Sequence, residues 1–169
     1  MANQERGDKA DCQVAIVVST FNEIVTSRLL AAAESTLTQL GTPSDHRQVI
    51  RVPGAFEIPL IAKTLAQSHR FDAIICLGAV IRGETPHFEY ICAETSRGIG
   101  QAALETGIPI IFGVLTTDTV DQAMERSGPP ERNKGADAAR TALEMAVLMK
   151  RLSKTSLRQS GFLRESTTS

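Results

Sequence analysis

Aromatic residues and cysteine are scarce in this sequence. Of its 169 residues none is Trp, one is Tyr and three are Cys, and aromatic side chains make up only 4%. Cys12, Cys76 and Cys92 are too widely spaced for a zinc knuckle or a redox dithiol. Cys76 lies inside an apolar run, which favours buried, reduced thiols in a cytosolic protein. We therefore expect no metal site.

Long apolar runs and an excess of one charge are also missing. No apolar run approaches transmembrane length, and residues 1–11 are polar, without the apolar segment of a signal peptide. A formal net charge of −1 argues against a general nucleic-acid binder. The hydrophobic fraction of 42% is still enough for a proper core. We expect a cytoplasmic protein that binds neither nucleic acid nor a membrane.

Apolar runs alternate with segments of helical spacing. The runs at residues 14–18, 49–52, 73–79 and 109–115 are typical of buried strands. Helical segments follow them, with Thr20 or Asn22 as a possible cap for the first, a short one ending near Arg126, and a final one beginning near Lys134. This alternation predicts a three-layer αβα sandwich around a central parallel four-stranded sheet.

The chain ends are polar. Residues 1–12 are expected to form a flexible segment, residues 13–152 one domain, and residues 153–169 a polar, disordered tail. In that tail only Leu157, Phe162 and Leu163 offer apolar anchors.

The segment from Leu77 to Phe88 is the best candidate for a site. It joins a buried strand to a helix, and such turns lie at the carboxyl edge of a parallel sheet, where α/β folds bind ligands. Gly83 permits close backbone approach, Thr85 carries a hydroxyl, and His87 stands at the helix start. Helix N-termini attract anions such as phosphate, and an imidazole beside one could transfer protons near neutral pH. The alternative is a lone histidine that closes a loop.

Other residues in the strand-to-helix turns also have two interpretations. Phe21 could be a core plug or a stacking surface for a flat heterocycle. Glu57 could be a helix-start charge or an acceptor for ligand hydroxyls. Phe112 could be core, or it could contact a ligand or an interface.

Several blocks of sequence resemble the signature of the 6,7-dimethyl-8-ribityllumazine synthase family. The longest is Leu-Gly-Ala-Val-Ile-Arg-Gly-Glu-Thr-Pro-His-Phe at 77–88, and Val-Pro-Gly-Ala-Phe-Glu-Ile-Pro at 52–59 is another. The remaining blocks, in the family's order, are Phe21-Asn22, Phe-Gly-Val-Leu-Thr at 112–116, Gln122-Ala123, Glu125-Arg126 and Asn133-Lys134-Gly135. The resemblance covers about residues 14–148. It implies a flavodoxin-like fold and the penultimate step of riboflavin biosynthesis, without a metal or organic cofactor.

The resemblance also implies a role for each matching residue. His87 would be the catalytic proton-transfer group, Phe21 would stack on a pyrimidine ring and Glu57 would hold a ribityl chain. Glu84, Thr85 and Arg126 would bind phosphate. The other implied substrate-binding residues are Asn22, Ala55, Phe56, Ala79, Val80, Ile81, Gly83, Phe112 and Lys134.

Family members form pentamers, some of which close into icosahedral capsids, and their sites are shared between neighbouring subunits. By that analogy Phe112 would come from one subunit and His87 with Arg126 from the other, or the reverse. Riboflavin synthase is a candidate partner beside the small-molecule substrates. The sequence departs from the family at two places. Thr20 stands where many relatives have Arg, and residues 129–132 replace a Gly- and Lys-containing stretch without an insertion. The length of this loop permits a capsid, but its altered residues leave capsid formation undecided.

Two other classes of protein fit parts of the sequence. One is a non-catalytic relative that binds lumazine or flavin, or forms a shell; the other is a flavodoxin-like electron carrier. The set of His87, Arg126, Glu57 and Phe21 favours an enzyme, because a pure binder needs no proton-transfer group beside a phosphate site.

Overall fold

A four-stranded parallel sheet forms the centre of the molecule. The computed structural model describes residues 7, 9–129 and 131–162. The strands are β1 (Val14–Ser19), β2 (Arg47–Val52), β3 (Ala73–Ile81) and β4 (Ile110–Thr117), in the order β2-β1-β3-β4. The predicted sheet is therefore confirmed, with β3 and β4 each extending two residues further than their apolar runs.

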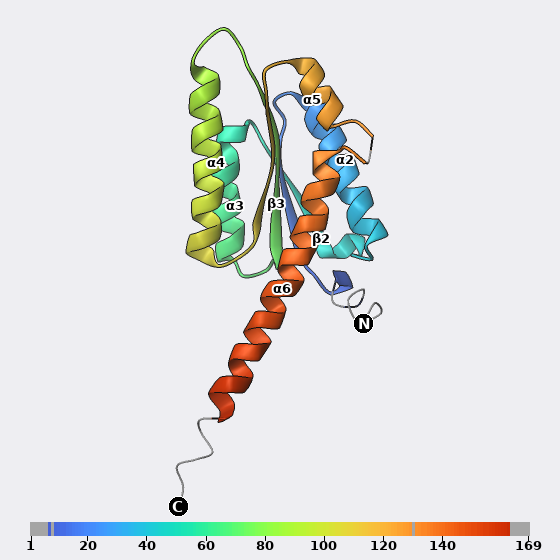
Figure 1. Ribbon diagram of the computed structural model, residues 1–169, viewed down its shortest axis with the longest axis vertical. Helices are drawn as coiled ribbons and strands as arrows, with labels where there is room; N and C mark the ends of the chain where they lie inside the picture. The colour runs from blue at the N-terminus through green and yellow to red at the C-terminus, as the bar shows by residue number, and fades with distance from the viewer. Residues whose placement is uncertain (1–6, 8, 130, 163–169) are drawn as a thin grey trace, which may run out of the picture.

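Helices cover both faces of the sheet (Figure 1). On one side lie α2 (Glu23–Gln39), α5 (Val120–Arg126) and α6 (Lys134–Phe162), and on the other lie α3 (Ile58–Gln67) and α4 (His87–Thr106). The short 3-10 helices η1 (Ser44–His46) and η2 (Ala55–Glu57) flank β2. This is the three-layer, flavodoxin-like sandwich expected from the sequence.

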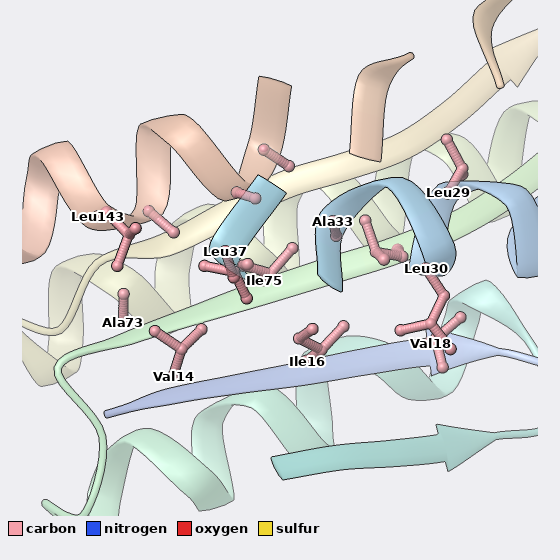
Figure 2. Close-up of a cluster of buried hydrophobic side chains, with 14 of the residues drawn as sticks. Val14, Ile16, Val18, Leu29, Leu30, Ala33, Leu37, Ala73, Ile75 and Leu143 are labelled. Atoms are coloured by element: carbon pink, nitrogen blue, oxygen red, sulfur yellow. The ribbon is translucent and has the colours of Figure 1, made fainter. Parts of the chain in front are cut away.

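Alternate side chains of each central strand enter two separate cores. Val14, Ile16 and Val18 of β1 pack toward α2 and α6, where Leu29 and Leu143 meet them (Figure 2). The residues between them face α3 and α4. Every residue of β1 is buried, because a central parallel strand has a helical layer on each side.

The α2 and α6 helices approach each other to backbone contact. A Cβ added to Gly135 would lie 2.0 Å from the carbonyl oxygen of Leu29, so no side chain fits there. The preceding Asn133 fixes the start of α6: its amide donates to the Ser127 carbonyl at 2.9 Å, and its Oδ1 accepts from the Gly135 N–H at 2.8 Å.

The α6 helix continues past the end of the sheet and projects from the body (Figure 1). Its backbone is helical through Phe162, so part of the segment expected to be a disordered tail is helix instead. Residues 150–159 contain neither Pro nor Gly, which lets the helical hydrogen bonding continue. The flexible segment predicted for residues 1–12 and the end of the tail fall largely or wholly outside the described residues, and the domain boundary after residue 152 stays a prediction.

Candidate active site

Three strand-to-helix connections meet at the carboxyl edge of the sheet. Phe21 and Asn22 follow β1, η2 follows β2, and residues 82–86 follow β3. Because β1 lies between β2 and β3, these connections are neighbours in space. This edge carries most of the residues predicted to form the site.

Asn22 links two of these connections rather than capping a helix. It occupies the N-cap position of α2 with a left-handed backbone (φ 58°), and its side chain makes no capping hydrogen bond. Its amide donates instead to the carbonyl of Ala79 at 2.9 Å. Thr20 does not cap α2 either, since its hydroxyl lies 3.3 Å from both the Val52 and the Pro53 carbonyl oxygens. The expectation that one of these side chains caps the helix was therefore wrong.

Two phenylalanine rings on this edge are open to solvent. Phe21 is 70% exposed and Phe56 is 55% exposed, whereas the adjacent Ala55 is buried. A core plug is therefore not the role of Phe21 in this chain. Exposed rings at the mouth of a sheet suit stacking on a flat ligand.

Glu57 follows Phe56 in the chain and ends η2. It is exposed at the N-cap position of α3, without a side-chain capping bond. It folds back over Gly54, where an added Cβ would lie 2.9 Å from Oε2. Without a capping bond, the carboxylate oxygens can accept hydrogen bonds from ligand hydroxyls at this edge.

The end of β3 passes from buried strand to exposed loop. Ala79 is buried, and Val80 and Ile81 are half-buried with their backbone in the sheet. Gly83, which follows, has open space within 4 Å of an added Cβ, so nothing within the chain requires a glycine there. The close approach predicted for Gly83 could only be to a ligand or another subunit.

His87 is the first residue of α4. Within the described part of the chain, the side chains of Glu84, Thr85 and His87 are exposed and make no hydrogen bond or ion pair. The N-terminal turn of this 20-residue helix leaves backbone N–H groups without helical partners. Backbone N–H donors, a carboxylate, a hydroxyl and an imidazole are thus all exposed to solvent at the start of α4.

Arg82 is a residue of this edge to which the sequence assigned no role. Its Nε donates to Asp118 at 2.7 Å, and its Nη1 donates to Glu89. Its guanidinium carbon lies 4.1 Å from the centroid of the Phe88 ring. The bonds to Asp118 and then Glu89 raise the pKa of Arg82, and the bond from Arg82 lowers the pKa of Glu89. The sequence contained a signal for these contacts. Arg82 follows a predicted strand, and Phe88 and Glu89 stand at the start of the next helix, within reach of its long side chain.

Phe112, Arg126 and Lys134 lie apart from His87 within one chain. Phe112 pairs in register with Cys76, whereas Ala79 pairs with Leu115, so Phe112 sits about 10 Å back along the edge strand β4. It is 44% exposed. Arg126 ends α5 and donates to the Gln122 carbonyl at 3.2 Å, and Lys134 begins α6 and pairs with Asp137 at 2.9 Å. The two helices cover the sheet face opposite α4 (Figure 1).

A cavity of about 390 Å³ opens at the other, amino edge of the sheet. Phe71, Asp72, Pro109 and Lys150 are among its lining residues, and none of the predicted site residues is. It is therefore separate from the candidate site. Among the residues with described positions, no three His, Cys, Asp or Glu side chains gather as metal ligands would. None of the described helices has both the length and the hydropathy needed to cross a membrane.

Comparison with known proteins identifies the family of the chain. A sequence model of the 6,7-dimethyl-8-ribityllumazine synthase family matches residues 11–150. The chain belongs to this family. A relative from Syntrophus aciditrophicus (strain SB), named 6,7-dimethyl-8-ribityllumazine synthase, is 60% identical over 137 residues, which span 81% of this chain and 89% of the relative. The chain is therefore a transferase of riboflavin biosynthesis, and the resemblance seen in its sequence is confirmed.

Proposed function

We propose that the carboxyl edge of the sheet is where this chain condenses 5-amino-6-(D-ribitylamino)uracil with 3,4-dihydroxy-2-butanone 4-phosphate. The product is 6,7-dimethyl-8-ribityllumazine, and inorganic phosphate and water leave. This placement is supported by one observation: exposed rings, a carboxylate and an imidazole that has no hydrogen-bonding partner among the described residues all lie at the same edge. Family membership supplies the reaction.

The uracil half of the site is built by the first two connections. Phe21 stacks on the pyrimidine, Phe56 lies near it, and Glu57 accepts hydrogen bonds from the ribityl hydroxyls. The backbone of Ala79, Val80 and Ile81 contacts the ring. Asn22 supports this half by holding the Ala79 carbonyl at 2.9 Å, which ties the β1 connection to the end of β3.

The phosphate half lies at the start of α4. The free N–H groups of its first turn, with Gly83, Glu84 and Thr85, surround the phosphate, and the helix dipole favours an anion there. Glu84 contributes through its backbone, because a carboxylate side chain would repel a dianion. The guanidinium of Arg126 supplies the opposite charge, with Lys134 adding positive charge nearby.

His87 transfers protons in both directions. Imine formation between the uracil amine and the ketone requires proton movement, and the loss of phosphate requires removal of a carbon-bound proton. An imidazole gains and loses a proton near neutral pH, so one group can serve both steps. Holding the two substrates together contributes much of the remaining acceleration, up to roughly 7–11 kcal/mol in favourable cases.

The full site requires a second copy of the chain. Phe112 lies back along β4, and α5, which ends at Arg126, covers the sheet face opposite α4. We therefore assign Arg126 to the neighbouring subunit together with Phe112, whereas the family analogy drawn from the sequence grouped Arg126 with His87. A pentamer in which each site is shared would bring them together, and it would also cover exposed apolar side chains such as Leu60, Tyr90 and Leu104. We place this assembly in the cytoplasm.

Incubation of the purified protein with both substrates tests this function. We expect lumazine fluorescence to rise together with one equivalent of inorganic phosphate, above the rate without protein. A non-catalytic relative would bind added lumazine and leave both signals at the background rate. That result would contradict the proposed reaction.

A further inference from the structure

The loop from Gly83 to Pro86 carries candidate phosphate-binding groups but few internal contacts. The side chains of Glu84 and Thr85 make no hydrogen bond or ion pair to other described residues, and an added Cβ on Gly83 would meet nothing within 4 Å. The Glu89 N–H donates to the Pro86 carbonyl at 3.1 Å, which only closes the first turn of α4. The loop therefore depends on its two ends for its position.

Arg82 holds both ends at once. Its backbone N–H continues the sheet by donating to the Thr117 carbonyl at 2.9 Å, and its Nε donates to Asp118 at 2.7 Å, so the residue is fixed to the end of β4. From this position its Nη1 donates to Glu89 and its guanidinium covers the Phe88 ring. Glu89 and Phe88 belong to the first turn of α4, beside His87.

We propose that Arg82 is a positioning residue that sets the place of the His87 imidazole by fixing the first turn of α4 to the end of β4, a role that rests on the proposed function. It touches neither substrate in this role. Arg82 acts through Phe88 and Glu89, the two residues that follow His87 in the helix. Its influence on the reaction is therefore an influence on where the proton-transfer group stands.

Arginine is suited to this role in a way that lysine is not. The planar guanidinium can donate to two carboxylates from different nitrogens while its face lies on an aromatic ring, and all three contacts are present here. A lysine ammonium keeps the charge but is a single point on a flexible stem, so it cannot hold Asp118, Glu89 and the ring in one fixed geometry. The substitution Arg82→Lys thus removes the geometry while retaining the net charge.

The kinetic test uses Arg82→Lys with Arg97→Lys as its matched control. Arg97 belongs to α4, the helix that carries His87, and pairs with Glu94. Its side chain is 71% exposed, and it lies ten positions after His87. Displacement of a catalytic group by about 1 Å can cost on the order of 100-fold in rate. We expect Arg82→Lys to lower kcat about tenfold, with KM for the ribitylaminouracil changed less than about twofold, and Arg97→Lys to leave both unchanged. Equal effects of the two substitutions would overturn the inference.

A double-mutant cycle separates positioning from a general structural effect. If Arg82 acts through the imidazole, Arg82→Lys causes less than about a twofold further loss of kcat when His87 is already alanine. Independent, multiplicative losses in the double variant would mean that Arg82 does not act through His87, and would overturn the proposed route.

Hydrogen exchange supplies a readout that does not depend on turnover. We expect amides of residues 83–90 to exchange faster in the Arg82→Lys protein than in the wild-type and Arg97→Lys proteins, measured on the full-length assembly by mass spectrometry. Unchanged exchange would show that Arg82 does not anchor this segment. A wild-type protein without turnover would contradict the proposed function, while the exchange comparison would still decide whether the anchor exists.

Discussion

His87 combines exposure with the absence of any hydrogen-bonding partner among the described residues. Structural histidines usually donate or accept at one ring nitrogen, as His46 does with the Ala10 carbonyl at 3.0 Å. His87 instead stands at a helix start with both nitrogens available. The open alternative from the sequence, a histidine that merely closes a loop, predicts such a contact, and none is seen in the described part of the chain.

Replacement of His87 by alanine should reduce the rate moderately. We expect kcat to fall roughly 10- to 100-fold, at or below the lower end of the range for general acid–base groups, because substrate positioning remains intact. Steady-state fluorescence kinetics would measure the loss. His69→Asn is the control, since His69 is exposed in a left-handed turn (φ 53°) at the other edge and asparagine tolerates that backbone. An unchanged kcat in the His87 variant would remove it from the mechanism.

Replacement of Arg126 by alanine should weaken binding of the phosphorylated substrate more severely. We expect KM for the butanone phosphate to rise at least about tenfold, because a charge-assisted bond to the dianion is lost. KM for the uracil substrate should change far less. The matched control is Arg132→Ala, a neighbouring exposed arginine that pairs with Glu125 at 3.2 Å. An unchanged KM for the butanone phosphate would refute the assignment of Arg126.

At the scale of elements, short apolar runs were sufficient to predict the four strands, and apolar residues at helical spacing predicted the main helices. Thr119 caps α5, because its side-chain oxygen accepts from the Gln122 N–H at 3.2 Å. The short helices η1 and η2 were not predicted, because three residues carry no periodic signal. The role of Asn22 was missed for a different reason: its partner, the Ala79 carbonyl, is 57 positions away in the chain.

The helix α4 contains two glycines, and only one of them is required by close packing within the chain. A Cβ on Gly98 would lie 2.8 Å from Cβ of Pro59 in α3, whereas a Cβ on Gly100 would meet nothing within 4 Å. Close packing within the chain explains the first glycine and not the second. The crossing of α3 and α4 therefore depends on one small residue.

Alanine should lower the free energy of unfolding at position 98 but not at position 100. We expect Gly98→Ala to destabilise the protein by about 1–3 kcal/mol through overpacking against Pro59. Gly100→Ala should leave the free energy of unfolding unchanged or raise it by up to about 1 kcal/mol, since alanine is the better helix former. Denaturant unfolding at one fixed protein concentration would compare them. Destabilisation by Gly100→Ala would show that another subunit packs against that position.

At the scale of the whole molecule, an ion pair of Lys150 connects α6 to Asp72, the residue before β3. Its ammonium lies 2.8 Å from the Asp72 carboxylate, which also accepts from the Gln13 N–H at 2.7 Å. Desolvation lowers the pKa of Lys150, but the bond to Asp72 and the nearby charges outweigh it and raise the pKa above its ordinary value of 10.5. The pair thus contributes stability while Lys150 remains protonated in the folded chain.

The stability due to this pair should vary with pH in a defined direction. Because the folded pKa is raised, the contribution is complete below about pH 10.5 and is lost as pH rises through the folded value. We expect Lys150→Met to lower the free energy of unfolding by about 1 kcal/mol at pH 7–9, and the gap to narrow above pH 10.5. Lys63→Met, which removes the more exposed pair with Glu105, is the control. A gap that widens at high pH would contradict this.

The assembly should be visible in solution. For a pentamer of 18.2-kDa chains we expect sedimentation to give a species of about 91 kDa, or multiples of it, rather than a monomer. The apolar side chains exposed in the single chain, including Leu104 at 89%, are the physical reason. A stable monomer at micromolar concentration would contradict a shared site.

The proposed division of the site between chains could not be derived from residues alone. The parallel direction of the strands follows from the alternation of strands and helices, and it brings Phe21, Glu57 and His87 to one edge. From the sequence, Phe112 could equally be a core residue or a residue that contacts a ligand or an interface. Its exposure depends on β4 being the edge strand and on what covers that strand. Only the resemblance to a family indicated a second subunit.

The contact of Gly135 with the Leu29 carbonyl limits how the chain can evolve. Even the methyl group of alanine would have to push two helices apart, and the displaced helix carries Lys134 at its first turn and Lys150 further along. A mutation at this one codon would therefore disturb both the proposed position of Lys134 in the active site and the ion pair of Lys150 at the amino edge of the sheet. In a library randomised at position 135, we expect selection to recover glycine alone, while tolerant positions only a few residues away diversify.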